Sequence, residues 1–273
     1  MTDTPRTADQ PTPASPAPDP AAPTETRTTK IENILGTDGV ARLAASTVLV
    51  LGCGGVGSNC VEALARGGVG RIAIVDRDVV SITNINRQAI AYTSTIGLRK
   101  IDVMEGMVKD INPACTVIKR DDFVTAETIG ALYDELLAAC NGRIDYVVDA
   151  IDTVSAKLAV AALAQERGVT LISSMGGAMK LHPECLRITD IHKTVNCRLS
   201  RIVRKECRKR GIRHLKVLYS CEKARIATSK PGTARSERSG MGTVSFMPPI
   251  MGQMIAGEVI RTLSGVGTEP ARC

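Results

Sequence analysis

The sequence predicts an α/β protein in which a mostly parallel sheet carries helices on both faces. Short β-branched and apolar runs alternate with longer amphipathic segments, and glycines or an Asn-Pro pair separate most of them. A glycine-rich turn follows the first of these runs, as it does where a parallel strand leads into a helix. With 273 residues, of which 44% are hydrophobic, the chain can bury one large α/β domain or two small ones. The fold class is therefore Rossmann-like.

The alternation begins at residue 47. We expect strands at 47–51, 71–75, 115–119, 145–149 and 169–173, and helices at 57–66, 100–110, 126–140 and 155–167. Gly67–Gly68, Asn112-Pro113 and Gly168 are stop signals for three of these helices. Strands that alternate with helices of this length form a parallel sheet.

The remaining segments divide the chain into three parts. Residues 1–28 hold seven of the thirteen prolines and should form a disordered tail rich in Pro, Thr and Ala. Residues 29–178 form the Rossmann-like nucleotide-binding part. Residues 179–273 form a C-terminal extension of the same domain, with strands at 186–189 and 216–219, a mobile loop at 224–240 and a last helix at 250–263.

The positive charge is concentrated in residues 193–216. This segment holds ten Lys and Arg residues and one acid, whereas the whole chain has a net charge of +7. The helical spacing predicts that Leu199, Ile202, Val203 and Cys207 face inward, which leaves exposed Arg198, Arg201, Lys205, Arg208 and Lys209. A phosphate backbone and a merely solvated helix face both fit this pattern. With no Trp, two Phe and four Tyr, the chain would hold nucleic acid through phosphates more than through base stacking.

Composition argues against several classes of protein. No apolar run approaches the roughly 20 residues of a membrane helix, and the start of the chain lacks the apolar core of a signal peptide. The nine cysteines are scattered and form no Cys-x-x-Cys pair, which favours reduced thiols over a disulfide framework or a zinc site. We expect a cytoplasmic protein without membrane contact. Cys221 beside Lys223 and Arg225 is a weak candidate nucleophile, and an ordinary surface thiol is the favoured interpretation.

A nucleotide site is predicted at the first glycine turn. Gly52, Gly54 and Gly57 match a Gly-x-Gly-x-x-Gly fingerprint between a strand and a helix, where backbone N–H groups bind phosphate. Asp76 ends the next strand, the position from which an acid accepts hydrogen bonds from ribose hydroxyls. This fingerprint alone is compatible with NAD, FAD or ATP.

Polar residues downstream favour ATP. Residues 78–88 form a dense polar cluster, and Lys100 follows on the next helix. Hydride transfer has no use for the extra cations Arg87 and Lys100, whereas charge that moves onto a leaving pyrophosphate must be stabilised. Asp149 and Asp152 lie at the end of the fourth strand, where a carboxylate can hold Mg²⁺ with the phosphates. We prefer Asp152 as the metal ligand, and a helix-capping role is the alternative for Asp149.

These motifs together resemble the ubiquitin-activating-enzyme superfamily. The resemblance rests on Gly-x-Gly-Gly-Val-Gly-Ser, Asp76, the Asp-x-Val-x-x-Thr-Asn-x-Asn-Arg-Gln stretch, Lys100 and the Asp-Ala-Ile-Asp segment. Within the superfamily the chain is similar to the tRNA threonylcarbamoyladenosine dehydratases over residues 27–265. The sulfur-carrier-activating branch usually has Ser-Asn-Leu-Gln-Arg-Gln and often paired Cys-x-x-Cys motifs, which this chain lacks.

The resemblance implies an ATP-dependent cyclisation of N6-threonylcarbamoyladenosine in tRNA. The threonyl carboxylate would attack the α-phosphate, and the ureido group would then close a ring and expel AMP. The alternative is adenylation of the C-terminus of a ubiquitin-like sulfur-carrier protein, with that carrier or a cysteine desulfurase as partner. A nicotinamide-dependent oxidoreductase is a distant third hypothesis.

The resemblance also assigns residues. Gly54 and Gly55 would contact phosphate and Asp76 the ribose, with Asp78 beside them in the nucleotide site. Arg87 and Lys100 would bind the β- and γ-phosphates. Asn84 and Gln88 would support them, and Asp152 would serve Mg²⁺. Lys30, three residues after Arg27, stands where the family usually has an arginine that reaches the ATP of the neighbouring protomer, which implies a homodimer.

Overall fold

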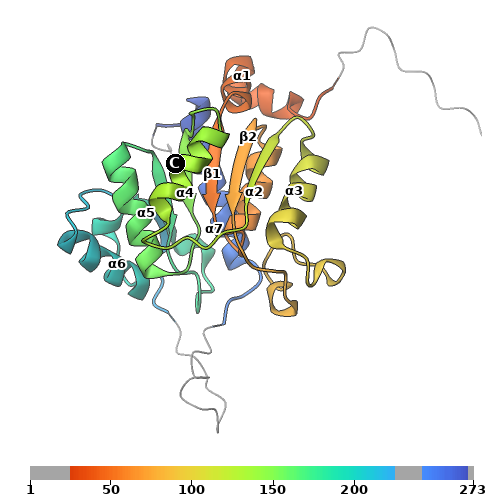
Figure 1. Cartoon of the computed structure of the whole chain (residues 1–273). Coiled ribbons are helices and arrows are strands. Elements are labelled where there is room, and N and C mark those ends of the chain that lie inside the picture. Colours follow the sequence, from red (N-terminus) through yellow and green to blue (C-terminus); the bar gives the residue numbers. More distant parts are fainter. Residues whose placement is uncertain (1–24, 225–241, 270–273) are drawn as a thin grey trace, which may run out of the picture.

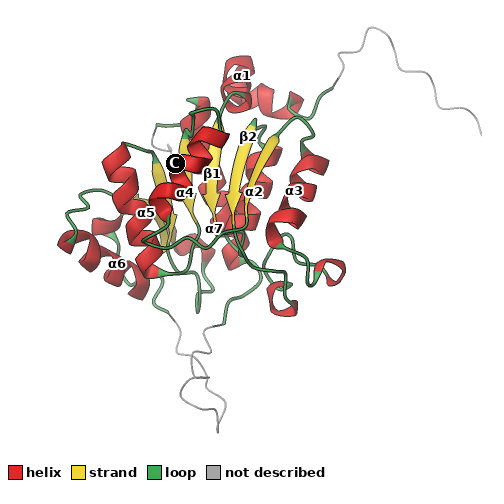
Figure 2. Ribbon diagram, in the orientation of Figure 1, coloured by secondary structure: helices red, strands yellow, loops and turns green. Residues whose placement is uncertain are grey.

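The computed structural model describes residues 25–224 and 242–269. A central sheet carries helices on both faces (Figures 1 and 2), as the sequence predicts. Most of the tail expected at 1–28 and nearly all of the loop expected at 224–240 lie outside the described residues.

The sheet has seven strands in the order β3-β2-β1-β4-β5-β7-β6. They are β1 (Thr47–Leu51), β2 (Arg71–Val75), β3 (Thr116–Arg120), β4 (Tyr146–Asp149), β5 (Leu171–Ser174), β6 (Leu186–Asp190) and β7 (Lys216–Ser220). All neighbours pair in parallel except β6 and β7, which pair antiparallel. The chain runs from β1 outward through β2 and β3, then returns to β4 on the other side of β1. This reversal is a topological switch point, and ligands of open α/β sheets bind at the carboxyl ends of the strands there.

Two hydrophobic cores cover the two faces of the sheet. The helices are α1 (Thr29–Ala44), α2 (Gly57–Arg66), α3 (Lys100–Ile111), α4 (Ile129–Ala139), α5 (Val154–Arg167), α6 (Arg198–Lys209) and α7 (Met247–Ser264). Along β1, Val48 and Val50 belong to the core with α2, α3 and α7, whereas Leu49 and Leu51 belong to the core with α4, α5 and α6. Because both faces are covered, β1 is a continuous apolar run rather than an alternating one.

The starts of α4 and β5 differ from the expectation. Helix α4 begins at Ile129, three residues late, because Thr125 and Thr128 hydrogen-bond in a turn before it. Strand β5 begins at Leu171, two residues late.

Three further expectations need correction. Helix α1 was not predicted; it bends at Gly36, which has a φ of 70°. Helix α7 begins at Met247, three residues early, because prolines are tolerated in a first turn, where the N–H has no helical partner. The inward orientation of Ile202 is wrong: this side chain is 42% exposed, and the buried stripe of α6 consists of Ser200, Val203 and Cys207.

Among the described residues, no helix is long and apolar enough to span a bilayer.

Candidate nucleotide-binding active site

A cavity of about 360 Å³ opens at the carboxyl ends of β1, β2 and β4, at the switch point of the sheet. It brings together ten of the residues predicted for the nucleotide site. These are Gly52, Gly54, Gly55, Asp76, Asp78, Asn84, Arg87, Gln88, Lys100 and Asp152. Segments up to 100 residues apart therefore converge where the sequence predicted them to.

The glycine turn is shaped by close backbone approaches. Gly52 has a φ of 94°, a conformation that favours glycine, and a Cβ at Gly57 would overlap the carbonyl oxygen of Gly52. A Cβ at Gly55 would lie 2.9 Å from Pro248 and 3.1 Å from the Arg87 side chain, whereas Gly54 faces open space. Gly57 thus lets the helix pack on the turn, Gly55 lets Arg87 approach, and Gly54 leaves room for phosphate.

The first turn of α2 joins the glycine turn to the Arg87 segment. The Asn59 amide donates to the carbonyl oxygens of Gly55 (2.7 Å) and Arg87 (3.1 Å). The Ser58 hydroxyl donates to the Gly54 carbonyl (2.7 Å) and accepts from the Ala89 N–H (3.0 Å). Buried polar side chains thus fix the position of the glycine turn relative to the Arg87 segment.

Asp76 is oriented by two backbone donors. One carboxylate oxygen accepts from the Cys53 N–H (2.7 Å) and the other from the Asp78 N–H (2.8 Å). A carboxylate oxygen accepts more than one hydrogen bond, so the side chain can still receive ribose hydroxyls. Burial, followed by the charge of Asp76, raises the pKa of the Cys53 thiol far above its usual range, so this thiol stays neutral. This agrees with Cys53 as a small residue that fits the loop.

Lys100 supplies a nearly buried cation. Its Nζ lies 2.7 Å from the Asp78 carboxylate, and the two side chains are 6% and 64% exposed. Lys100 is the first residue of α3, an end of a helix at which a cation is unfavourable for stability. Its position is therefore better explained by an anionic ligand in the cavity.

Arg87 is held by its own segment. Its guanidinium donates to the Thr83 carbonyl (3.0 Å) and to the Asn86 side chain (2.8 Å). Asn84 accepts from the Ser81 N–H (3.0 Å), so it shapes the turn that carries Arg87. Gln88 is 7% exposed, and its Oε1 has no hydrogen-bond partner among the described atoms. Gln88 therefore lines the cavity as a residue, while this oxygen is buried away from the open space.

Asp149 and Asp152 have different environments. Asp149 is fully buried, and its carboxylate accepts from Lys157 Nζ (3.1 Å) and from the Ser173 hydroxyl (2.5 Å). Helix α5 begins only at Val154, so Asp149 does not cap it, and Lys157 already neutralises the charge that a metal would need. Asp152 is exposed and lines the cavity, and within the described residues its carboxylate accepts a hydrogen bond only from the Thr153 hydroxyl (3.3 Å).

This difference predicts opposite results for two similar substitutions. Asp149→Asn should lower the free energy of unfolding by about 3–5 kcal/mol, because it leaves the Lys157 ammonium buried without its counter-charge. Asp152→Asn, its matched control, should change stability by less than about 0.5 kcal/mol, as an exposed site does, but should abolish most turnover. Urea denaturation and steady-state rates measure both effects. If Asp152→Asn were the less stable variant, the two assignments would have to be exchanged.

Residues that the sequence did not single out also line the cavity. The Arg77 guanidinium lies 5.7 Å from the centre of the Phe123 ring, and both side chains line the cavity with Val124 and Pro248. A flat aromatic and an apolar wall suit a nucleobase, while the cations suit phosphates. The available signal was the position of Asp-Asp-Phe-Val just after the third strand, since the carboxyl ends of parallel strands share one edge.

Lys30 does not lie at this cavity in the single chain. It is 79% exposed and pairs with Glu25 at 2.7 Å. Arg27 and Thr28 lie beside the C-terminal ends of α2 and α3, and α1 lies at the amino ends of the strands (Figure 1). The single chain therefore does not place Lys30 beside the other predicted site residues.

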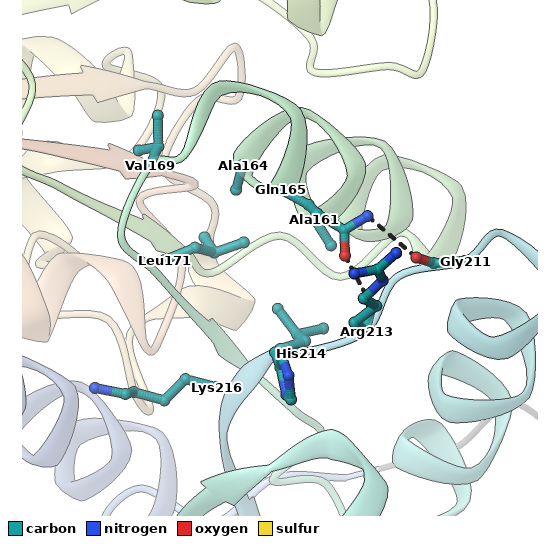
Figure 3. A pocket seen from close by; sticks show the side chains of 10 residues that line it. Ala161, Ala164, Gln165, Val169, Leu171, Gly211, Arg213, His214 and Lys216 are labelled. Carbon is teal, nitrogen blue, oxygen red and sulfur yellow. Dashed lines mark hydrogen bonds between the residues drawn. The ribbon is translucent and has the colours of Figure 1, made fainter.

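A second cavity, of about 470 Å³, lies at the amino ends of β5 and β7. Figure 3 shows its lining of α5 side chains, Leu171 at the start of β5, and Arg213, His214 and Lys216 at the start of β7. Gln165 spans it by accepting from the Arg213 N–H (2.8 Å) and donating to the Gly211 carbonyl (3.1 Å). None of the predicted nucleotide-binding residues lines it.

The glycine turn, Asp76 and the converging cations are the arrangement of a nucleotide-binding α/β protein. The chain belongs to the ThiF family, whose model matches residues 26–272. It is 39% identical over 241 residues to the tRNA threonylcarbamoyladenosine dehydratase of Bacillus subtilis, which covers 85% of this chain and 92% of that protein.

Solved structures agree with this membership. The fold is similar to that of E. coli tRNA N6-threonylcarbamoyladenosine dehydratase in complex with AMP, with a TM-score of 0.77 and 28% identity. For the complex of the same enzyme with ATP the TM-score is 0.75, also with 28% identity. In both comparisons 88% of this chain and 94% of the other are covered.

Proposed function

We propose that this protein is an ATP-dependent tRNA-modifying enzyme that cyclises N6-threonylcarbamoyladenosine by adenylating its carboxylate. The observation that carries the proposal is the convergence of Arg87, Lys100 and Asp152 with the glycine turn in one cavity. The ATP-bound and AMP-bound relatives, named as tRNA threonylcarbamoyladenosine dehydratases, support the nucleotide and the substrate.

Each part of the cavity has its own role in binding ATP. The glycine turn and the N-terminus of α2 bind phosphate oxygens through backbone N–H groups. Asp76 orients the ribose, and Arg87 and Lys100 stabilise the charge that develops on the departing pyrophosphate. The exposed carboxylate of Asp152 fits Mg²⁺, which would neutralise phosphate charge when bound.

No nucleophile from the protein is required. Once the threonyl carboxylate has displaced pyrophosphate from the α-phosphate, the ureido group of the same substituent attacks the acyl carbon and AMP leaves. The attacking group is tethered to the acyl group, so its effective concentration is high. The neutral Cys53 thiol beside the phosphate site is consistent with this route.

Helix α6 offers a surface for tRNA phosphates. It begins near Gly176, at the carboxyl end of β5, and ends near Gly211, whose carbonyl contacts Gln165 at the end of α5. The helix therefore runs from the carboxyl ends of the strands, where the nucleotide cavity lies, towards their amino ends. Its exposed cations follow that line: Arg198, Arg201, Lys205, Arg208 and Lys209. Such a row fits the backbone of an RNA whose modified nucleotide enters the cavity.

A homodimer is part of the proposal. Six of the eleven large hydrophobic side chains exposed in the described residues fall between β2 and α3, next to the cavity: Val79, Ile82, Ile85, Tyr92, Ile96 and Leu98. Clustered exposed apolar residues typically mark an interface. A two-fold symmetric contact over this segment is the kind that could bring Lys30 of a second chain to the cavity.

The shared site predicts rescue between two inactive variants. Lys30→Ala and Arg87→Ala should each be poorly active alone. In a mixed dimer the chain with intact Arg87 receives an intact Lys30, which restores one site in two. A one-to-one mixture should therefore recover about a quarter of wild-type activity, since half of the random dimers are mixed. Activity that stays at the mean of the two homodimers would mean that Lys30 does not act in the site of the neighbouring chain.

We place the enzyme in the cytoplasm. All eight cysteines within the described residues are free thiols, as is usual in a reducing compartment. ATP and tRNA are both available there.

The function is tested by nucleoside mass spectrometry. tRNA that carries N6-threonylcarbamoyladenosine is incubated with the protein, ATP and Mg²⁺, then digested. We expect the modified nucleoside to lose one water, and tRNA without the modification to stay unchanged. No mass change on tRNA, together with adenylation of a Gly-Gly-ended carrier protein, would instead support the sulfur-carrier alternative.

A further inference from the structure

Two cysteines face each other at the edge of the sheet. The antiparallel register of β6 and β7 pairs Leu186 with Ser220, so the next pair outward is Cys185 and Cys221. The ladder continues there, because the Cys221 N–H donates to the Cys185 carbonyl at 3.0 Å. Cα atoms of a hydrogen-bonded antiparallel pair lie about 5.5 Å apart, within the 4.4–6.8 Å or so that a disulfide requires.

The Cys221 thiol also lies close enough to affect the pKa of Cys185. Burial raises the pKa of Cys185, and the Cys221 thiol adds to this shift through its charge and a hydrogen bond with Cys185. Opposite residues of an antiparallel pair point to the same face, so the two side chains lie on one side of the sheet. Cys185 and Cys221 are partly exposed, whereas the other six described cysteines are buried. An oxidant in solution can therefore reach this pair.

The surroundings hold the pair in place. The carboxylate of Glu222 accepts from the backbone N–H groups of Leu181 and His182, each at 3.0 Å. Lys180 Nζ donates to the Glu222 carbonyl, and the Asn196 side chain donates to the Cys221 carbonyl at 3.1 Å. These hydrogen bonds hold the end of β7, with Cys221, against residues 180–182, which precede Cys185 along the chain.

We propose that Cys185 and Cys221 form a reversible disulfide by exchange with a low-molecular-weight disulfide. The Cys221 thiolate attacks one sulfur of the reagent and expels the first thiol, leaving a mixed disulfide on Cys221. The Cys185 thiolate then attacks the Cys221 sulfur and expels the second thiol. Two electrons and two protons pass from the protein dithiol to the reagent, which is reduced to two thiols. Cys221 attacks first, because the raised pKa of Cys185 lowers its thiolate fraction.

The disulfide would hold β6 and β7 together at the end of the sheet that carries the nucleotide cavity. It would join the start of β6 to the end of β7, next to the loop that contains Gly177. That glycine packs against Met247 and Met251 of α7, and Pro248 of the same helix lines the nucleotide cavity. Sheet register and thiol accessibility alone support the disulfide, so it does not depend on the proposed function.

The test is oxidation with glutathione disulfide, followed by alkylation of the remaining thiols and peptide mapping. In the wild-type protein we expect one peptide that links Cys185 to Cys221, which dithiothreitol reverses. In Cys185→Ser, the Cys221 thiol should accumulate a glutathione adduct, because no second thiol resolves it. Cys273→Ser should keep the link, which excludes the terminal cysteine as a participant.

Two results would overturn the proposal. The first is the absence of the linked peptide over the full range of glutathione redox ratios. The second is a stable glutathione adduct on Cys221 of the wild-type protein, which would show that Cys185 does not reach it. Equal melting temperatures of wild type and variants in dithiothreitol ensure that the comparison is made on folded protein.

Discussion

Lys100→Ala should lower kcat about 10²–10³-fold without unfolding the protein, because it removes an oriented cation from the developing pyrophosphate. The fold should tolerate the change. The only described acceptor of Lys100 Nζ is Asp78, whose side chain is 64% exposed, so no buried charge is left without a partner. Arg87→Ala should act in the same direction, since it removes the second cation of the cavity.

The matched control is Lys119→Ala. Lys119 also pairs with carboxylates, Asp102 at 2.8 Å and Glu105 at 2.5 Å, but it does not line the cavity. Its removal should leave kcat near wild type. Steady-state rates and denaturant unfolding separate the two roles. Near-native turnover of Lys100→Ala would reduce Lys100 to a structural partner of Asp78.

Reversing Arg201, Lys205 and Arg208 to Glu should weaken tRNA binding about a hundredfold at moderate salt, if each cation neutralises one phosphate. The log–log slope of affinity against salt should become shallower by roughly 0.7–0.9 for each phosphate that is no longer neutralised. ATP binding should persist, because none of the three residues lines the nucleotide cavity. Filter binding over a salt series and a thermal shift with ATP measure the two effects.

A second triple reversal controls for net charge. Arg66, Lys109 and Arg143 are exposed and lie on elements remote in sequence from α6: the ends of α2 and α3 and the turn before β4. Reversing these three residues changes the net charge by the same amount. It should leave the salt slope unchanged. Equal weakening by both triple variants would mean that α6 is a solvated helix face and that RNA responds only to total charge.

Local signals explain why so much of the parallel sheet could be predicted. The bounds of β1, α2 and β2 agree with the expectation at every residue, because Gly52, Gly67–Gly68 and Asp76 mark the ends of these elements in the sequence itself. The meeting of most predicted site residues in one cavity has the same cause. In a parallel α/β sheet, residues that follow strands meet at one edge, so their order along the chain already indicates their neighbours.

Features that depend on distant partners could not be predicted. Helix α1 is stabilised by packing on α7: its Arg42 donates to the Ser264 carbonyl, and Gly39 lies close to Ser264. The role of Asp149 depends on Ser173, a residue of another strand. For α6, helical periodicity identified the stripe around Val203 and Cys207 but placed Ile202 on the wrong side, because spacing alone does not fix the centre of a buried face.

The most direct test of carboxylate adenylation is the nucleotide product. ATP labelled at the α-phosphate is supplied with tRNA that carries N6-threonylcarbamoyladenosine, and the labelled nucleotide is quantified against the dehydrated nucleoside. Adenylation predicts one AMP and one pyrophosphate for each nucleoside that loses water, with no AMP formed from unmodified tRNA. Formation of ADP and inorganic phosphate in the same ratio would contradict the account, because it would mean attack at the γ-phosphate and an acyl phosphate intermediate.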